Sequence, residues 1–301
     1  MTPLQRYIAE EIAADHADGL LNRREALRRL GLLGFGVPAA VALLAACGGD
    51  DTDRPAATQT TTAPTPSAPP GSSTAVPTTP ITFAGTDNRA LQGAWAAAEQ
   101  PRGAVLVVHE NKGLTDHIRS IAGRFAGAGY SALAIDLLSE KGGTAAFTDP
   151  AAATAELSNT PQDQLIADLR AGLDELGRRV PGKKIGATGF CFGGGLVWLL
   201  LASGPSALAA ATPFYGPFPD GGDLSRSKAA VLGVYAVKDA RVDASRPAAE
   251  AALNRTGNPH EIWVAPDADH AFFNDTGQRY APVAATEAWT KVLGWYGTHL
   301  G

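Results

Sequence analysis

Cys191 is the residue of this chain whose surroundings point most directly to chemistry. It lies in the stretch GATGFCFGGGL, residues 186–196, after an apolar run that predicts a strand and before one that predicts a helix. The pattern Gly-x-Cys-x-Gly in that context is typical of a nucleophile elbow, with cysteine in place of serine. Its glycines permit a strained turn, and the following helix N-terminus favours negative charge on the sulfur. We therefore interpret Cys191 as a nucleophile rather than as a small buried hydrophobic residue.

A nucleophile of this kind needs a base, and the acid and the histidine follow it along the chain. His270 lies in the loop PDADHAFFND, after the last predicted strand, where it can reach the elbow. His260 begins a strand and His299 lies at the chain end, which favours solvated positions for both. His270 is therefore the candidate general base.

The acid is expected in the loop VYAVKDARVD, which supplies Asp239 and Asp243. Asp239 is nearer the end of the predicted strand and is better placed to hold the imidazole. Asp267 and Asp269 are too close in sequence to His270 for that role and are interpreted as solvated loop residues.

Strands and helices alternate along the chain after residue 80. This order predicts the α/β class, with a mostly parallel sheet covered by helices on both faces. The pattern predicts strands at 81–83, 91–97, 103–110, 130–135, 184–188, 209–215, 229–237 and 261–264, and helices at 117–128, 161–179, 194–202, 246–255 and 282–299.

Several motifs in this order resemble the dienelactone hydrolase family of α/β-hydrolases, over residues 81–300. They are GFCFGG around Cys191, Glu110 in VVHENKGLTDHIRSIAGRFAGAGYSALAIDLL, Asp239 in D-x-x-V, and DHAFFND followed by a tyrosine. The resemblance implies an α/β-hydrolase fold, a triad of Cys191, Asp239 and His270, and hydrolysis of an ester or lactone bond. It also implies that Glu110 accepts a hydrogen bond from the resting thiol and helps to form the thiolate.

Further roles are implied by the same resemblance. The oxyanion hole would be the backbone N–H groups of Phe192 and Asn111, and Tyr215 in PFYGPF would lie near the pocket. Asn274 stands four residues after the histidine, where family members that act on dienelactone carry an arginine for the substrate carboxylate. Arg279 is nearby but not at the matching position. This departure disfavours dienelactone as the substrate, whereas hydrolysis of some ester or lactone is still expected.

The first residues resemble a targeting signal. Arg23 and Arg24 precede a moderately apolar run, 30–46, and then Cys47 in LAAC, as in a twin-arginine signal with a lipobox. Glycines and a proline within the run make a permanent transmembrane helix the weaker interpretation. The expected organisation is a signal at 1–47 with lipidation of Cys47, a disordered Thr/Pro/Ala-rich linker at 48–80, and a hydrolase domain at 81–301, anchored at the cell envelope.

Composition and motifs also limit the partners. The net charge is −5 and no basic run follows residue 30, so nucleic-acid binding is not expected. His109 and Glu110 lack the second histidine of H-E-x-x-H, and no cysteine pair occurs, so we expect neither metal nor cofactor. The expected partners are a small ester or lactone and, through the lipid anchor alone, a membrane. His109 is interpreted as a local hydrogen-bonding residue.

Two other classes of function remain open. One is a catalytically inactive envelope lipoprotein that uses the hydrolase scaffold as a binding module. The other is a thiol redox protein, which is disfavoured because lipidation of Cys47 would leave Cys191 without a resolving cysteine. Ester turnover by the protein and by its Cys191→Ala variant separates these alternatives.

Overall fold

The computed structural model describes residues 1–47 and 68–301, and the chain divides into two compact units. The larger unit comprises 67–146 and 163–301, and the smaller unit comprises the N-terminal segment together with 147–162.

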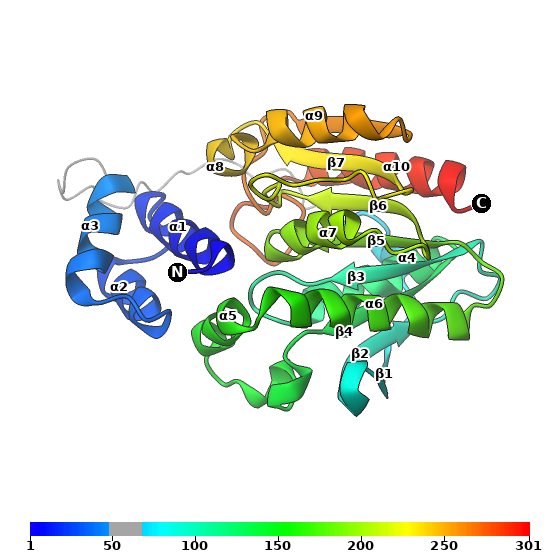
Figure 1. Cartoon of the computed structure of the whole chain (residues 1–301), viewed down its shortest axis with the longest axis horizontal. Coiled ribbons are helices and arrows are strands. Elements are labelled where there is room, and N and C mark those ends of the chain that lie inside the picture. The colour runs from blue at the N-terminus through cyan, green and yellow to red at the C-terminus, as the bar shows by residue number, and fades with distance from the viewer. Residues whose placement is uncertain (48–67) are drawn as a thin grey trace. The chain divides into compact units, whose positions relative to one another are not determined.

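The larger unit is built on an eight-stranded sheet with the order β1-β2-β4-β3-β5-β6-β7-β8 (Figure 1). Strand β2 runs antiparallel to both of its neighbours, and all other neighbouring pairs are parallel. The strands are β1 Thr79–Ala84, β2 Ala90–Ala96, β3 Gly103–Val108, β4 Tyr130–Asp136, β5 Ile185–Phe190, β6 Leu208–Phe214, β7 Ala230–Ala236 and β8 His260–Ala265.

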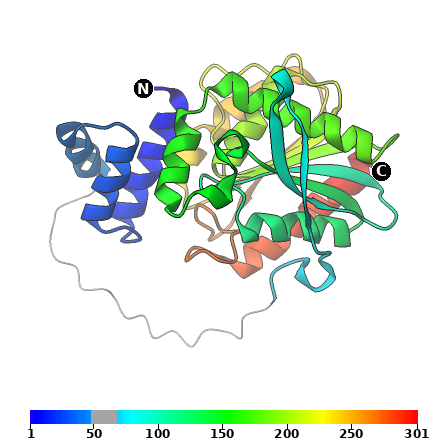
Figure 2. The same ribbon diagram turned by 90° about the horizontal axis from the view of Figure 1, so that it is seen from below.

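Helices cover both faces of this sheet (Figures 1 and 2). On one face α4 and α10 lie side by side, with the rings of Phe125 and Trp289 4.8 Å apart. On the other face α6 and α7 lie together, and Arg170 donates to the carbonyl of Ser203. The helices are α4 Asp116–Gly127, α6 Gln162–Arg179, α7 Phe192–Ser203, α8 Ala240–Asp243, α9 Arg246–Thr256 and α10 Pro282–His299.

The central strands are apolar because both of their faces are covered. Every residue of β3 and of β4 is buried, which is the pattern of parallel strands enclosed by helices. Burial on both faces therefore explains why these strands appear in the sequence as continuous apolar runs. Parallel strands end at a common edge, and ligands of open α/β sheets bind beyond that edge.

The larger unit includes secondary structure before residue 81, where the sequence predicts the start of the hydrolase domain. Residues 48–67 of the expected linker lie outside the described residues, but a 3-10 turn spans Ser72–Thr74 and β1 starts at Thr79. The backbone N–H of Val76 donates to the carbonyl of Gly123 in α4 at 3.0 Å. A Cβ at Gly123 would lie 2.3 Å from the Val76 oxygen, so this glycine permits the close contact. The folded unit thus includes residues assigned to the linker.

The described residues of the smaller unit form the helices α1 Pro3–Ala17, α2 Arg23–Leu32, α3 Val37–Cys47 and α5 Pro150–Asn159. Helix α1 contacts the other three. Arg28 pairs with Asp149 at 2.7 Å, and Gln5 donates to Asn159 at 2.8 Å. Helix α5 was not predicted from the sequence, although the Asp149 cap and the proline after it are ordinary helix-start signals. No helix among the residues described here combines the length and apolar character needed to cross a membrane.

Candidate active site

The turn from β5 to α7 presents Cys191. This residue lies between the last residue of β5 and the first of α7, with φ 56° and ψ −116°. A positive φ is strained for any residue except glycine, so tight packing has to hold the turn. A Cβ at Gly193 would lie 2.4 Å from the Val108 carbonyl oxygen, and glycine is therefore required at that position. The cysteine is buried, with 2% of its surface exposed.

His270 and Asp239 form a buried hydrogen-bonded pair. The loop after β7 carries Asp239 and the loop after β8 carries His270, and Asp239 Oδ2 lies 2.6 Å from His270 Nδ1. Burial opposes ionisation of Asp239, but the hydrogen bond and the charge of His270 outweigh burial and hold the pKa of this carboxyl below its ordinary value. A ring nitrogen of His270 lies within 4.8 Å of the Cys191 sulfur. The structure thus brings together the three residues of the expected triad.

The alternative acids and histidines lie elsewhere. Asp243 pairs with Arg246 at 2.7 Å. The carboxylate of Asp269 accepts from the backbone N–H of His270 and lies 3.7 Å from Arg279. The remaining candidate histidines make local contacts: the ring of His260 is bound to Asn258 and Asn254, and that of His299 packs on Trp295.

Glu110 and Asn111 follow β3 at the same edge of the sheet. The carboxylate of Glu110 accepts a hydrogen bond from Asn274 Nδ2 at 2.7 Å. His109 Nε2 accepts from the backbone N–H of Leu137 at 3.1 Å, so the proton is on Nδ1, which donates to the Glu110 carbonyl at 2.6 Å. Burial lowers the pKa of His109. The neutral imidazole ties the Glu110 backbone to the end of β4.

Phe192 and Tyr215 complete the set of predicted residues. The N–H of Phe192 belongs to the first turn of α7, where N–H groups have no partner within the helix. Tyr215 is fully buried, has φ 33°, and packs edge-on against the His270 ring at 5.3 Å. Burial, followed by the nearby charges of Glu110 and Cys191, raises the pKa of Tyr215 well above its ordinary value. The Tyr215 hydroxyl is therefore protonated, and its ring packs beside the imidazole of His270.

A buried charged cluster beside the site was not predicted. We call His117, Arg124 and Asp275 the Asp275 cluster. Asp275 Oδ1 lies 2.5 Å from His117 Nδ1, and Oδ2 lies 2.6 Å from Arg124 Nη2. Burial opposes ionisation of Asp275, but the donor His117 and the positive charge of Arg124 lower its pKa to about 2. His117 and Arg124 are spaced so that they share one face of the predicted helix, and this spacing was the only signal in the sequence. Nothing near them indicates a partner that lies about 150 residues further along the chain.

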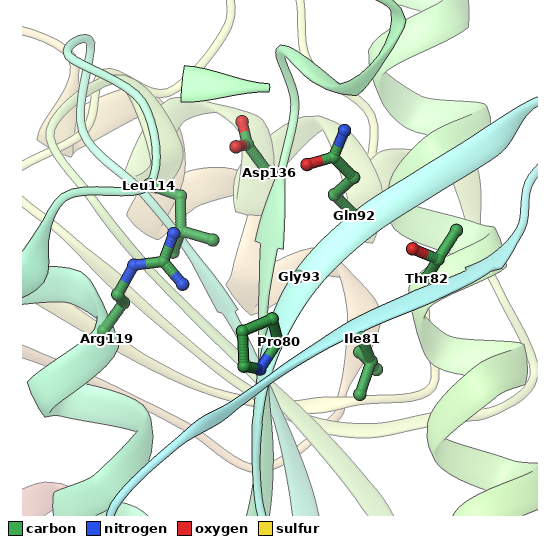
Figure 3. A pocket seen from close by; sticks show the side chains of 8 residues that line it. All are labelled: Pro80, Ile81, Thr82, Gln92, Gly93, Leu114, Arg119 and Asp136. Atoms are coloured by element: carbon green, nitrogen blue, oxygen red, sulfur yellow. The ribbon is translucent and has the colours of Figure 1, made fainter. Parts of the chain in front are cut away.

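A separate cavity of about 290 Å³ opens beside β1 and β2 (Figure 3). Figure 3 shows Asp136 and Gln92 on one side of it and Arg119 on another. None of the three triad candidates contributes to its lining, so we do not treat this cavity as the reactive centre. The lining residues are Pro80, Ile81, Thr82, Gln92, Gly93, Leu114, Arg119 and Asp136.

The mixed sheet, its flanking helices and the cysteine elbow define an α/β-hydrolase, as the sequence predicts. The model of the dienelactone hydrolase family matches residues 91–300. The chain belongs to the dienelactone hydrolase family and is a hydrolase enzyme of that family. The predicted family and fold class are therefore confirmed.

Known proteins agree with this assignment. The "Putative carboxymethylenebutenolidase" of Saccharolobus solfataricus is 31% identical over 247 residues, which cover 70% of this chain and 95% of that protein. A protein of the same name from Escherichia coli strain K12 is 32% identical, over 66% of this chain and 78% of its own. Among solved structures, the "Putative Dienelactone Hydrolase" of Klebsiella pneumoniae has a TM-score of 0.63 and 29% identity, covering 73% of this chain and all of its own. The dienelactone hydrolase-like promiscuous phosphotriesterase P91 from metagenomic libraries has a TM-score of 0.65 and 26% identity, covering 75% of this chain and all of its own.

Proposed function

We propose that this protein hydrolyses an ester or lactone through Cys191, His270 and Asp239, with a thioester intermediate. The thiolate attacks the substrate carbonyl, and the backbone N–H groups of Phe192 and Asn111 stabilise the negative oxygen that forms. His270 Nε2 takes the proton of the Cys191 thiol as the sulfur attacks, and gives it to the leaving alkoxide. It then takes a proton from the water that attacks the thioester and returns it to the sulfur when the acid leaves. Asp239 holds the imidazole in the tautomer that these steps require.

The observation that carries this proposal is the position of His270 between two partners. Its Nδ1 is bound to Asp239 at 2.6 Å, and a ring nitrogen lies within 4.8 Å of the Cys191 sulfur. This geometry supports the proposed roles of Cys191 as nucleophile, His270 as base and Asp239 as the residue that orients the base. The names of the relatives from Saccharolobus solfataricus and Escherichia coli support an ester or lactone bond as the target.

The test is turnover of p-nitrophenyl acetate by the full chain. Cys191→Ala and His270→Ala should each lower kcat by about three or more orders of magnitude, because members of a triad act as a unit. Unchanged turnover in either variant would contradict the proposed site. Absence of turnover by the unaltered protein would instead support a scaffold that binds ligands without catalysis.

We further propose that the preferred substrate is uncharged. Asn274 contacts Glu110 and carries no charge, so it offers a carboxylate an amide hydrogen bond rather than a bidentate ion pair. Arg279 lies 3.7 Å from Asp269. A neutral short-chain ester should therefore have a kcat/KM at least as high as that of an anionic analogue of the same size. A strong preference for the anion would contradict this proposal.

For localisation, we propose export by the twin-arginine route and lipidation of Cys47. Arg23 and Arg24 are exposed at the start of α2, and the apolar helix α3 ends at Cys47. Replacing both arginines by lysine should keep the protein in the cytoplasm, and Cys47→Ala should release it from the membrane fraction, because buried acyl chains provide the anchoring energy. If the Cys47→Ala protein stays with the membrane after signal processing, a lipid anchor does not hold it there.

A further inference from the structure

The chain forms a tight turn directly after β3. The N–H of Gly113 donates to the carbonyl of Glu110 at 3.3 Å, and Gly113 has φ 84°, a value that favours glycine. The same carbonyl accepts from His109 Nδ1 at 2.6 Å, which holds the start of the turn. Asn111 is the second residue of the turn, so the orientation of the whole turn sets the direction of its backbone N–H.

The backbone that leads into this turn touches the elbow. A Cβ at Gly193, in the first turn of α7, would lie 2.4 Å from the carbonyl oxygen of Val108 and 2.5 Å from that of His109. The N–H of Phe192 belongs to the same first turn of α7. Two donors stabilise one oxygen only when both point at it, so the orientation of the turn after β3 decides whether the Asn111 N–H can act together with that of Phe192.

Thr144 holds the far end of the turn. Its Oγ1 accepts a hydrogen bond from the backbone N–H of Leu114 at 2.7 Å and donates its own hydrogen to Asp136 Oδ1 at 2.9 Å. The N–H of Thr144 donates to Asp136 Oδ2 at 2.7 Å. Asp136 is the last residue of β4, and Figure 3 shows it together with Leu114. Thr144 thus joins the chain after the turn to the end of a central strand.

The fit between Thr144 and the turn is close. A Cβ at Gly113 would lie 2.2 Å from Thr144 Oγ1 and 2.9 Å from Cγ2, so the side chain packs directly on the turn. Leu114 and Asp136 are 4% and 3% exposed. Without the hydroxyl, the buried N–H of Leu114 would lose its acceptor, which is costly enough for the turn to move towards another one.

We propose that Thr144 is a positioning residue that, by holding the Leu114 N–H, aims the Asn111 N–H at the oxygen that becomes negative during ester hydrolysis. The proposal rests on the cysteine hydrolase function proposed above and adds a determinant of oxyanion stabilisation to it. In the step concerned, the sulfur of Cys191 forms a bond to the carbonyl carbon, and the electron pair of the carbonyl bond moves to its oxygen. Thr144 acts on this step only through the turn.

Two rates separate this role from a general structural one. One is kcat for p-nitrophenyl acetate, and the other is alkylation of Cys191 by iodoacetamide, followed on the peptide that contains this residue. Alkylation displaces iodide at a saturated carbon and forms no oxyanion, so it does not need the Asn111 N–H. In the full chain, Thr144→Val should lower kcat by about 10- to 100-fold, since misplacing a donor forfeits part of its effect, and should leave the alkylation rate within about three-fold. An unchanged kcat, or an equal change of both rates, would overturn the proposal.

Thr144→Ser keeps the hydroxyl and should retain kcat within about three-fold of the wild type, because the lost methyl group makes none of these hydrogen bonds. A serine variant as slow as the valine variant would also overturn the proposal. Thr144→Ala removes the hydroxyl without adding a methyl group next to Gly113, and it decides the question if the valine variant does not fold.

Thr82→Val makes the same chemical change at an exposed position of β1 and is the matched control, which should leave both rates unchanged. The proposed function fails by a different result, namely full ester turnover in Cys191→Ala. A wild-type kcat in both Thr144→Val and Thr144→Ala, with Cys191→Ala inactive, would remove Thr144 from the account and leave the triad in place.

Discussion

At the scale of single residues, the contact between Asp239 and His270 determines which ring nitrogen can exchange protons. Nδ1 is bound to the carboxylate at 2.6 Å, so its hydrogen is held there and Nε2 is the nitrogen that would serve the thiol and the leaving group. Burial of both side chains strengthens this contact, because the effective dielectric constant is low. The proposed chemistry therefore requires a hydrogen-bond acceptor opposite Nδ1, which here is the carboxylate oxygen of Asp239.

Asp239→Asn tests this dependence. An amide can present N–H to Nδ1 and would then stabilise the wrong tautomer, so kcat should fall on the order of 10⁴-fold, as in serine triads. Asp243→Asn is the matched control, since Asp243 pairs with Arg246 instead, and its effect on kcat should be mild. Steady-state kinetics with p-nitrophenyl acetate measures both. A larger loss for Asp243→Asn than for Asp239→Asn would refute the choice of acid.

At the scale of elements, the elbow requires that α7 approach the end of β3 closely. Gly193 lies where a Cβ would be 2.4 Å from the carbonyl oxygen of Val108 and 2.5 Å from that of His109. Both obstacles are backbone atoms and cannot rotate away. The close approach therefore fixes the position of the first turn of α7, which carries the Phe192 N–H group.

Gly193→Ala and Gly294→Ala should have opposite effects. Alanine at 193 forces the elbow apart, so both ester turnover and the free energy of unfolding should fall. Gly294 is an exposed residue of α10 with no atom near its potential Cβ, so alanine there should stabilise the protein by about 0.5–1 kcal/mol through helix propensity. Urea unfolding of each variant measures the changes. Equal behaviour of the two variants would show that the close contact at the elbow is unimportant.

The lowered pKa of Asp275 predicts how the stability of the folded protein depends on pH. Because the pKa of Asp275 is lowered to about 2 in the folded protein and is near 3.9 in an unfolded chain, its charge stabilises the fold above the higher value. That stabilisation is lost as the pH falls through about 2. Asp275→Asn should cost about 3–5 kcal/mol at neutral pH, because it breaks a buried pair.

Urea unfolding at a series of pH values tests the prediction for Asp275. The difference between the wild type and Asp275→Asn should shrink as the pH is lowered from about 4 towards 2. Asp220→Asn, at an exposed position, should change stability by less than about 0.5 kcal/mol throughout. A difference for Asp275→Asn that does not depend on pH would mean that the carboxylate charge is not what stabilises the loop.

Most strands and helices of the larger unit could be predicted, because each leaves a pattern in a short stretch of sequence. Two-sided burial makes β3 and β4 continuous apolar runs, and the elbow requires glycines next to Cys191. The contact between Asn274 and Glu110 has no such local cause, since 164 residues separate the two. The same holds for the Asp275 cluster. Helix α5 was missed for another reason: it is short, and its alanine-rich sequence lacks a marked apolar stripe.

At the scale of the whole molecule, one chain combines a hydrolase unit with a smaller helical unit. The smaller unit joins the N-terminal helices to α5, through contacts that include Arg28 with Asp149. The residues interpreted as a targeting signal are therefore helical and contact one another in the structure. The proposed chemistry lies entirely within the larger unit, because the triad candidates and Glu110 all belong to it.

The central claim is that Cys191 carries the acyl group during ester hydrolysis. The most direct measurement is mass spectrometry of the full-length Cys47→Ala protein, quenched with acid shortly after mixing with p-nitrophenyl acetate and then digested. Cys47→Ala leaves Cys191 as the only cysteine. We predict one acetyl group on the peptide that contains Cys191, and a longer-lived adduct in His270→Ala, where water is not activated. Continued ester turnover with no acetyl group on that peptide at any quench time would contradict the account.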